Sequence, residues 1–279
     1  MAGPSQRMTL KDHLLMRYRL WQAERELRRE MRKSELPAFY RRAEQTDVDG
    51  IVINGGSWTV GDFLPVGFEA YVRLPNPFWK IVAEGTEGAV RQRSDPGDDD
   101  PDVWAKPVRN SEIAEANGLR MTHDTGSGEI CGPSDGYRAA SADQAWSWGP
   151  SECNIEPFVA DRLFRILSSE TDPKDRCLSG QWEGGSSGWD SDVRLATRGW
   201  SYFVWRARFC DIAEWLRQPC TFERDMHVPQ IVWPVARQWF LATLYSGHSN
   251  YLAGSRTLID TVLTSGLEAY EVGLTDKAF

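Results

Sequence analysis

The sequence lacks the short motifs that identify the common classes of enzyme. Neither glycine-rich phosphate-binding pattern, G-x-x-x-x-G-K-[ST] or G-x-G-x-x-G, is present, which argues against nucleotide-dependent chemistry. The four histidines are scattered and include no HExxH zinc motif. The five cysteines contain no C-x-x-C pair, so we expect reduced thiols and neither a disulfide framework nor a zinc ribbon. These absences predict a protein without cofactor or metal.

Long apolar runs are also missing. No stretch approaches the roughly 20 apolar residues that a membrane span needs. The first residues become charged before any apolar run of signal-peptide length. We therefore expect a cytoplasmic protein that does not contact a membrane.

Tryptophan is abundant, and charge is unevenly distributed. The 279 residues include 13 tryptophans, large aromatics that serve as core or contact anchors. The net charge is −8. Residues 1–42 hold 11 Lys/Arg against five Asp/Glu, a net charge of +6, which leaves −14 for residues 43–279. A basic arm on an acidic body favours a protein partner, and contact with nucleic acid is the lesser alternative because the acidic body repels phosphates.

The arm is predicted to be an amphipathic helix. Thr9 and Asp12 match a capping box, and apolar residues follow at helical spacing as far as about Ser34. Aromatic residues among arginines suggest a helix that either packs on the body or binds a partner. The partner-binding candidates on it are Tyr18, Trp21, Arg25, Arg28 and Arg29.

Several tryptophans fall in predicted loops or at strand ends, where they either contact a partner or fold back into the core. Trp146 and Trp148 alternate, so that both indoles share one side of an extended chain. With Trp189 they are predicted partner contacts, and Trp58, Trp79 and Trp104 belong to the same group.

The sequence of the body predicts an α+β fold. Strand-like and helix-like segments alternate irregularly, which predicts a mixed or mainly antiparallel sheet with flanking helices. We expect one body over residues 43–279, and a division into lobes 43–150 and 151–279 stays open. Asn54-Gly55-Gly56 predicts a hairpin, and residues 94–102, with five aspartates, predict a solvated loop without calcium-binding spacing. A short strand or a helical turn is expected at 67–74, strands at 177–184, 198–207, 238–245 and 267–272, and helices at 110–117, 156–167, 211–216 and 255–263.

Three of these elements carry more specific predictions. Pro157 stands in the first turn of the helix at 156–167, and its inner face is formed by Phe158, Leu163, Ile166 and Leu167. Ser255 is expected to be the N-cap of the helix at 255–263. Aromatic residues on both sides of the segment 198–207 predict a central strand that is covered on each face.

Four segments resemble a family of uncharacterised proteins common in actinobacterial genomes. They are residues 63–74 (FLPVGFEAYVRL), 176–189 (RCLSGQWEGGSSGW), 200–207 (WSYFVWRA) and 232–272, which begins VWPVARQWFLATLY. The resemblance covers roughly residues 60–272. It departs at Leu244, where acidic residues are expected, and in the added basic arm. It implies kinship and source but no mechanism.

One string matches a catalytic motif. Residues 184–188 (GGSSG) fit the G-x-S-x-G nucleophile elbow, with Ser186 as nucleophile, but the residues that follow do not resemble an apolar helix. A histidine partner for it would be His227 or His248, and His248, in a polar glycine-containing turn, is the best single titrating candidate. The sequence therefore favours a non-catalytic binding protein, for which an immunity-type factor is one model, and a hydrolase using Ser186 or His248 is the alternative.

Overall fold

The structure is a computed structural model that describes residues 36–53, 58–92, 103–130, 150, 154–184, 191–197, 199–218, 228–244 and 247–279. The predicted arm helix, the acidic segment 94–102 and the Gly/Ser turn at 185–190 lie outside the described residues. Of the predicted site residues, His248 is described, and so are Trp58, Trp79 and Trp104 of the wider group of tryptophans. The others outside this part of the chain are Tyr18, Trp21, Arg25, Arg28, Arg29, Trp146, Trp148, Ser186 and Trp189.

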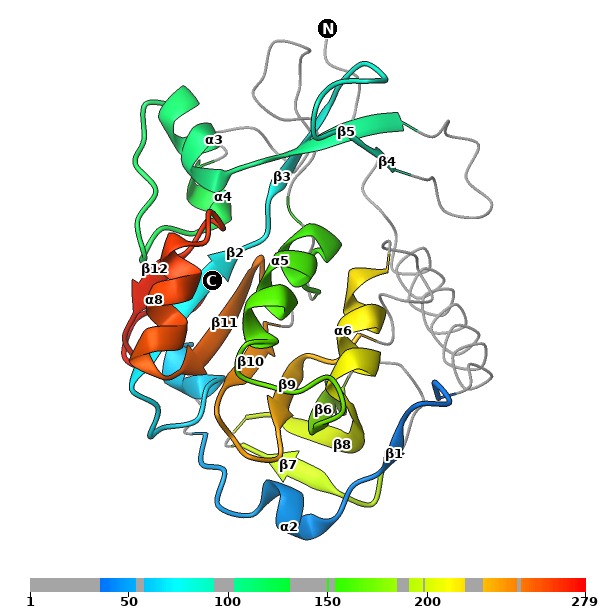
Figure 1. The fold of residues 1–279 in the computed structure, drawn as a ribbon. Coiled ribbons are helices and arrows are strands. Elements are labelled where there is room, and N and C mark those ends of the chain that lie inside the picture. The colour runs from blue at the N-terminus through cyan, green and yellow to red at the C-terminus, as the bar shows by residue number, and fades with distance from the viewer. Residues whose placement is uncertain are drawn as a thin grey trace, which may run out of the picture.

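A large antiparallel sheet forms the centre of the molecule (Figure 1). Within the described residues it has nine strands, in the order β1-β8-β6-β9-β10-β11-β2-β12, and β7 pairs with β8. Its strands are β1 (Arg41–Arg42), β2 (Ala70–Pro75), β6 (Arg176–Trp182), β7 (Arg194–Ala196), β8 (Ser201–Arg208), β9 (Ile231–Pro234), β10 (Phe240–Thr243), β11 (Ser249–Gly254) and β12 (Tyr270–Val272). The predicted α+β class is confirmed.

Strand β2 shows that the two halves of the chain share this sheet. It pairs with β11 on one side and β12 on the other, although more than 170 residues separate Ala70 from its partner Gly254. Residues from both 43–150 and 151–279 therefore build one layer. A smaller antiparallel sheet follows β2 in the chain, in the order β3-β5-β4. Its strands are β3 (Phe78–Ile81), β4 (Val90–Gln92) and β5 (Val103–Val108).

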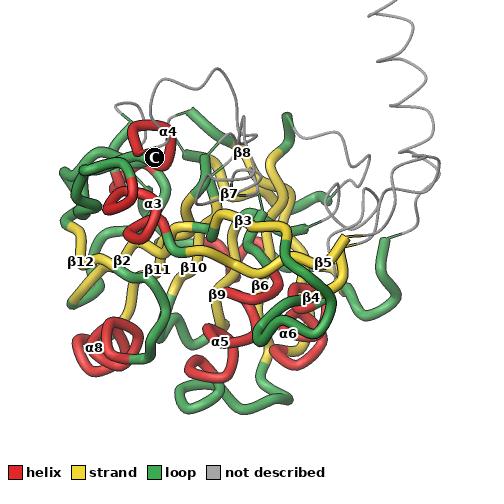
Figure 2. Tube along the Cα trace, turned by 90° about the horizontal axis from the view of Figure 1, so that it is seen from above, coloured by secondary structure: helices red, strands yellow, loops and turns green. Residues whose placement is uncertain are grey.

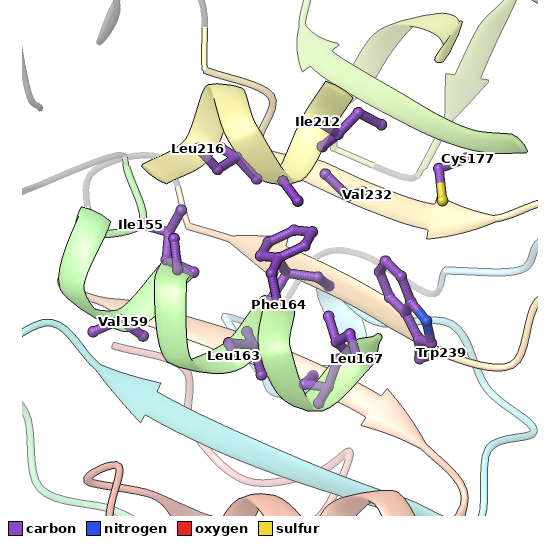
Figure 3. Packing of buried hydrophobic residues seen from close by; sticks show 14 of the residues in the cluster. Ile155, Val159, Leu163, Phe164, Leu167, Cys177, Ile212, Leu216, Val232 and Trp239 are labelled. Carbon is purple, nitrogen blue, oxygen red and sulfur yellow. The ribbon is translucent and has the colours of Figure 1, made fainter. Parts of the chain in front are cut away.

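Three helices cover one face of the large sheet (Figure 2). These are α5 (Pro157–Leu167), α6 (Phe209–Arg217) and α8 (Arg256–Thr264). Apolar residues at helical spacing make each of them amphipathic, and the apolar side is buried against the strands. Phe164 of α5 lies at the centre of this core, with its ring 5.6 Å from Phe209 and 6.4 Å from Trp239 (Figure 3).

Connecting segments cover the opposite face. A second core there joins Val60, Phe63 and Leu64 to strand residues such as Trp233 and Tyr251. Shorter elements complete the described chain. They are α2 (Gln45–Val48), the 3-10 turn η1 (Val60–Asp62), α3 (Asn110–Ala116) and α4 (Ser127–Ile130).

Local patterns predicted several of these elements well. Strand β8 was expected to be covered on both sides, and its alternate residues enter the two cores: Trp205 faces the helices, while Tyr202 and Val204 face the other side. Ser255 was the expected N-cap of α8, and its hydroxyl accepts a hydrogen bond from the Leu258 amide at 3.1 Å.

Two predictions were wrong in detail. Phe158 was assigned to the inner face of α5, but 40% of it is exposed, and its ring lies 5.0 Å from the Arg162 guanidinium. Residues 51–53 and 57–60 were expected to form a hairpin, yet residues 51–53 are not a strand and Thr59 bridges Lys277. The amides of Val60 and Gly61 donate to carbonyls of Asp276 and Leu274, so the C-terminal segment takes the pairing that a local turn signal could not reveal.

Within the part of the chain that the structure describes, no helix has both the length and the apolar character to cross a bilayer.

Candidate functional site

An arginine-rich groove lies at the β1 edge of the large sheet. Its volume is about 580 Å³. It is lined by five arginines and two carboxylate residues, together with Phe39 and Ala207. The five arginines are Arg41, Arg42, Arg176, Arg206 and Arg208, and the acids are Glu44 and Asp211.

The strand register explains why these arginines meet. Arg41 of β1 lies directly opposite Arg206 of β8, and Arg176 of β6 lies directly opposite Arg208. Directly opposite residues share a face of a sheet, as do residues two apart in one strand. Strands β1, β8 and β6 therefore carry Arg41, Arg206, Arg208 and Arg176 on one face.

Like charges placed directly opposite each other are destabilising, so part of this charge has to be offset. Arg206 is held by two carboxylates: Glu44 accepts from Nη1 at 2.8 Å and Asp47 accepts from Nη2 at 2.7 Å. The hydrogen bond to Asp47, followed by that to Glu44, raises the pKa of Arg206. Arg208 donates to both oxygens of Asp211, at 2.8 and 2.7 Å, and this contact lowers the pKa of the Asp211 carboxyl.

Two arginines of the groove, Arg41 and Arg176, have no carboxylate partner among the described residues. Arg41 donates from Nη1 to the carbonyls of Ala38 and Tyr40. The Arg176 side chain makes no hydrogen bond or ion pair in the described part of the chain. Arg42 pairs with Asp192 at 2.5 Å. Counting five arginines against Glu44, Asp47, Asp192 and Asp211, the groove region has an excess of one positive charge on a chain of net charge −8.

This arrangement is suited to binding an anion. Guanidinium groups present several N–H donors in a plane and pair with carboxylate or phosphate through two parallel hydrogen bonds. None of the described residues that line the groove is a histidine, cysteine or serine that could act as a nucleophile or base. Across the described residues, no group of three or more His, Cys, Asp or Glu side chains could hold a metal ion.

His248, the predicted titrating residue, lies elsewhere, in the turn before β11. It is half-buried, and its backbone carbonyl accepts from the Asn76 amide at 2.8 Å. Its neighbour Ser249 accepts a hydrogen bond at Oγ from Nε of Arg73 at 3.0 Å. Because Ser186 lies outside the described residues, a pairing of His248 with Ser186 stays a prediction.

The surroundings of His248 form a buried junction that the sequence analysis did not anticipate. The Asn250 side-chain amide donates to Asn76 Oδ1 at 2.9 Å, and the Asn110 side-chain amide donates to the Asn76 backbone carbonyl at 2.9 Å. Asn76 in turn donates to the Asn154 carbonyl at 2.7 Å. These neutral groups do not transfer protons, so we interpret them as a joint between the two sheets, α3 and α5.

Arg73 extends this junction. It is fully buried, and burial lowers the pKa of its guanidinium. Its Nη1 donates to the carbonyls of His123 at 3.1 Å and Thr125 at 2.7 Å, and its guanidinium lies 4.9 Å from the Phe279 ring centre. These contacts tie two surface segments to β2, which is a structural role.

Tryptophans outside the core form a second surface feature. Trp58 is exposed at 54%, and its backbone φ is +56°. Its ring centre lies 6.2 Å from that of Trp200, which lies 4.9 Å from that of Trp182. Trp79, by contrast, is buried in β3 and donates from Nε1 to Glu156 at 3.2 Å. The described chain thus presents a cluster of Trp58, Trp182 and Trp200 at the end of β8 that is remote from the arginines.

Comparison of the chain with protein-family models, with curated proteins and with solved structures finds no match.

Proposed function

We propose that this protein is a non-catalytic accessory factor whose arginine groove binds an acidic segment of a protein partner. The observation that carries the proposal is the register of β1, β8 and β6, which gathers four arginines on one face. Arg41 and Arg176 have no carboxylate partner there, so each can take one from another molecule. An immunity-type role would be one instance of such binding.

An acidic peptide segment suits the groove better than nucleic acid does. Proteins that bind duplex DNA tightly make about 6–10 phosphate contacts, and the affinity depends on that number. The groove has two arginines without a carboxylate partner, and residues 43–279 carry a net charge of −14. A peptide with two or three carboxylates matches this limited charge and avoids repulsion along a long polyanion.

Features outside the groove fit the same role. The basic segment 1–42, of net charge +6, ends at Arg41 and Arg42, which line the groove. The exposed Trp58 offers an aromatic anchor of the kind found in protein interfaces. Kinship with the actinobacterial family remains part of the proposal. A cytoplasmic location does too, since Cys177 and Cys210 are free thiols.

Binding of a fluorescent glutamate-rich peptide to the full chain tests the proposal. Arg176→Glu reverses a charge in the groove without removing an internal contact, so we expect about tenfold weaker binding or more. Arg120→Glu, at an exposed position outside the groove, is the matched control because it changes the net charge equally. Its affinity should stay within about twofold of the parent, since exposed charges far apart are screened by salt.

Three results would count against the proposal. The first is an absence of salt-sensitive peptide binding, and the second is an equal loss of affinity in both variants. The third is a single-stranded oligonucleotide that binds more tightly than the peptide and depends on Arg176, which would favour the nucleic-acid alternative instead.

A further inference from the structure

A second pocket, of about 210 Å³, lies between residues 50–51, residues 65–68 and the segment 233–240. It is separate from the arginine groove and shares no lining residue with it. Most of its wall is apolar. The lining residues with large apolar side chains are Ile51, Val66, Phe68, Trp233 and Phe240. Trp239 also borders the pocket, although its indole packs on the helix side of the sheet.

The size and edges of this pocket suit a small apolar molecule. A dry cavity of about 150 Å³ is known to hold benzene, so 210 Å³ accommodates one ring with a short substituent. Val66 is 44% exposed, and its amide donates to the carbonyl of Val52, which is 54% exposed. The pocket therefore adjoins apolar surface that faces water.

Trp233 supplies an unused hydrogen-bond donor. Its side chain is fully buried and stacks on Phe240 with ring centres 5.1 Å apart. Its indole Nε1 has no hydrogen-bond partner among the described residues. The indole of Trp239, which packs on the helix side of the sheet, differs because its Nε1 donates to Thr171 Oγ1 at 2.8 Å. Since buried donors are nearly always paired in proteins, a ligand acceptor at Trp233 would remove an unfavourable feature.

Arg237 is the one charged residue among the described residues that line the pocket. It sits at φ +57°, which is uncommon for a residue with a side chain, and its Nη2 donates to the carbonyls of Asp49 at 2.6 Å and Asp47 at 3.3 Å. A Cβ on Gly50 would lie 3.6 Å from its Nη1. These contacts hold the guanidinium in place, and its Nη1 and Nε donate to no acceptor in the described part of the chain.

We infer that this pocket binds a small apolar carboxylate, such as an arylacetate or a branched acyl acid. The apolar group would fill the space beside Phe68 and Phe240. The carboxylate would accept from the free donors of Arg237 and from Trp233 Nε1, because among the side chains of the described lining residues these two have N–H groups without an acceptor. This small-molecule site does not depend on the binding of a protein partner to the arginine groove.

Titration of the full chain with phenylacetate tests this, followed by NMR of the indole N–H groups. The indole N–H signal that is missing from the spectrum of Trp233→Phe is assigned to Trp233. We expect phenylacetate to shift the Trp233 signal downfield in a saturable way, because the N–H gains a charged acceptor, and toluene to leave it without a downfield shift. By calorimetry, Arg237→Gln should weaken phenylacetate binding about tenfold, and Arg120→Gln, outside the pocket, should not.

The inference fails if phenylacetate produces no saturable shift of the Trp233 signal at millimolar concentration. It also fails if toluene binds as tightly as phenylacetate, or if Arg237→Gln and Arg120→Gln bind phenylacetate equally. If Trp233→Phe does not fold, the calorimetric comparison of the two arginine variants decides the matter alone.

Discussion

The carboxylate of Asp47 holds the guanidinium of Arg206 through two of its nitrogens. Oδ1 of Asp47 accepts from Nη2 at 2.7 Å, and Oδ2 lies 2.6 Å from Nε. The same carboxylate accepts from the Glu44 amide at 2.8 Å and so caps helix α2. One buried acid thus has two roles: it fixes Arg206, which lies opposite Arg41, and it caps the start of helix α2.

Replacing Asp47 by Asn should therefore destabilise the fold. The Asp47 side chain is 4% exposed and that of Arg206 is 20% exposed. We expect a loss of about 2 kcal/mol, between the values of exposed and fully buried ion pairs, because Arg206 would face Arg41 with less compensation. Urea unfolding measures the change.

Glu44→Gln is the matched control for this variant. Glu44 pairs with the same arginine but is 68% exposed. Its loss should be at most about 1 kcal/mol. An equal loss of stability in both variants would show that burial does not determine how much the Asp47–Arg206 pair stabilises the fold.

Gly180 lies in β6 between two strands and has no room for a side chain. A Cβ there would come within 2.5 Å of Ile231 and 3.2 Å of Tyr202. Gly180→Ala should cost about 1–3 kcal/mol, because this central strand cannot move away from both neighbours. Thermal unfolding measures the effect.

Gly128 offers the comparison. It lies in α4, where an added Cβ would meet nothing within 4 Å. Gly128→Ala should leave stability unchanged or raise it by up to about 1 kcal/mol, as Ala favours helices. A destabilised Gly128→Ala together with an unaffected Gly180→Ala would contradict the packing described here.

Tyr40 should make stability fall at high pH. Burial raises the pKa of its hydroxyl from 10.0 to about 12, against a smaller opposite effect of a hydrogen bond with Ser179. The folded state then holds its proton more tightly than the unfolded state does. The stabilisation is complete below pH 10 and is lost as the pH rises towards 12.

Comparison with Tyr40→Phe isolates this residue from the other buried tyrosines. Between pH 10 and pH 12 the wild-type free energy of unfolding should fall by about 2–3 kcal/mol more than that of the variant. Chemical denaturation at several pH values measures it. Parallel pH profiles for the two proteins would show that Tyr40 titrates alike in both states.

Elements that depend on neighbouring residues were predictable. Helix α5 follows from its apolar spacing and from Pro157 in its first turn, and α8 from the Ser255 cap. The alternating aromatics of β8 indicated a strand buried on both sides, since side-chain direction alternates with every residue. These signals lie within one turn or one strand and need no partner to be recognised.

The features that define the candidate sites depend on distant residues. Arg41 and Arg206 are 165 positions apart, and the sequence does not show that they become neighbours. The predicted hairpin failed for the same reason, because Thr59 bridges Lys277. The unused donor of Trp233 likewise depends on what surrounds that indole.

The sequence by itself determined the α+β class, the amphipathic helices, the doubly covered strand and the contrast between basic arm and acidic body, because composition and spacing encode them locally. Tertiary structure alone decided the rest: which arginines share a face, which tryptophans are buried, and where a pocket keeps a charge beside an unpaired donor. Strand register and long-range packing set these relationships, since each depends on residues that meet only when the sheet is assembled.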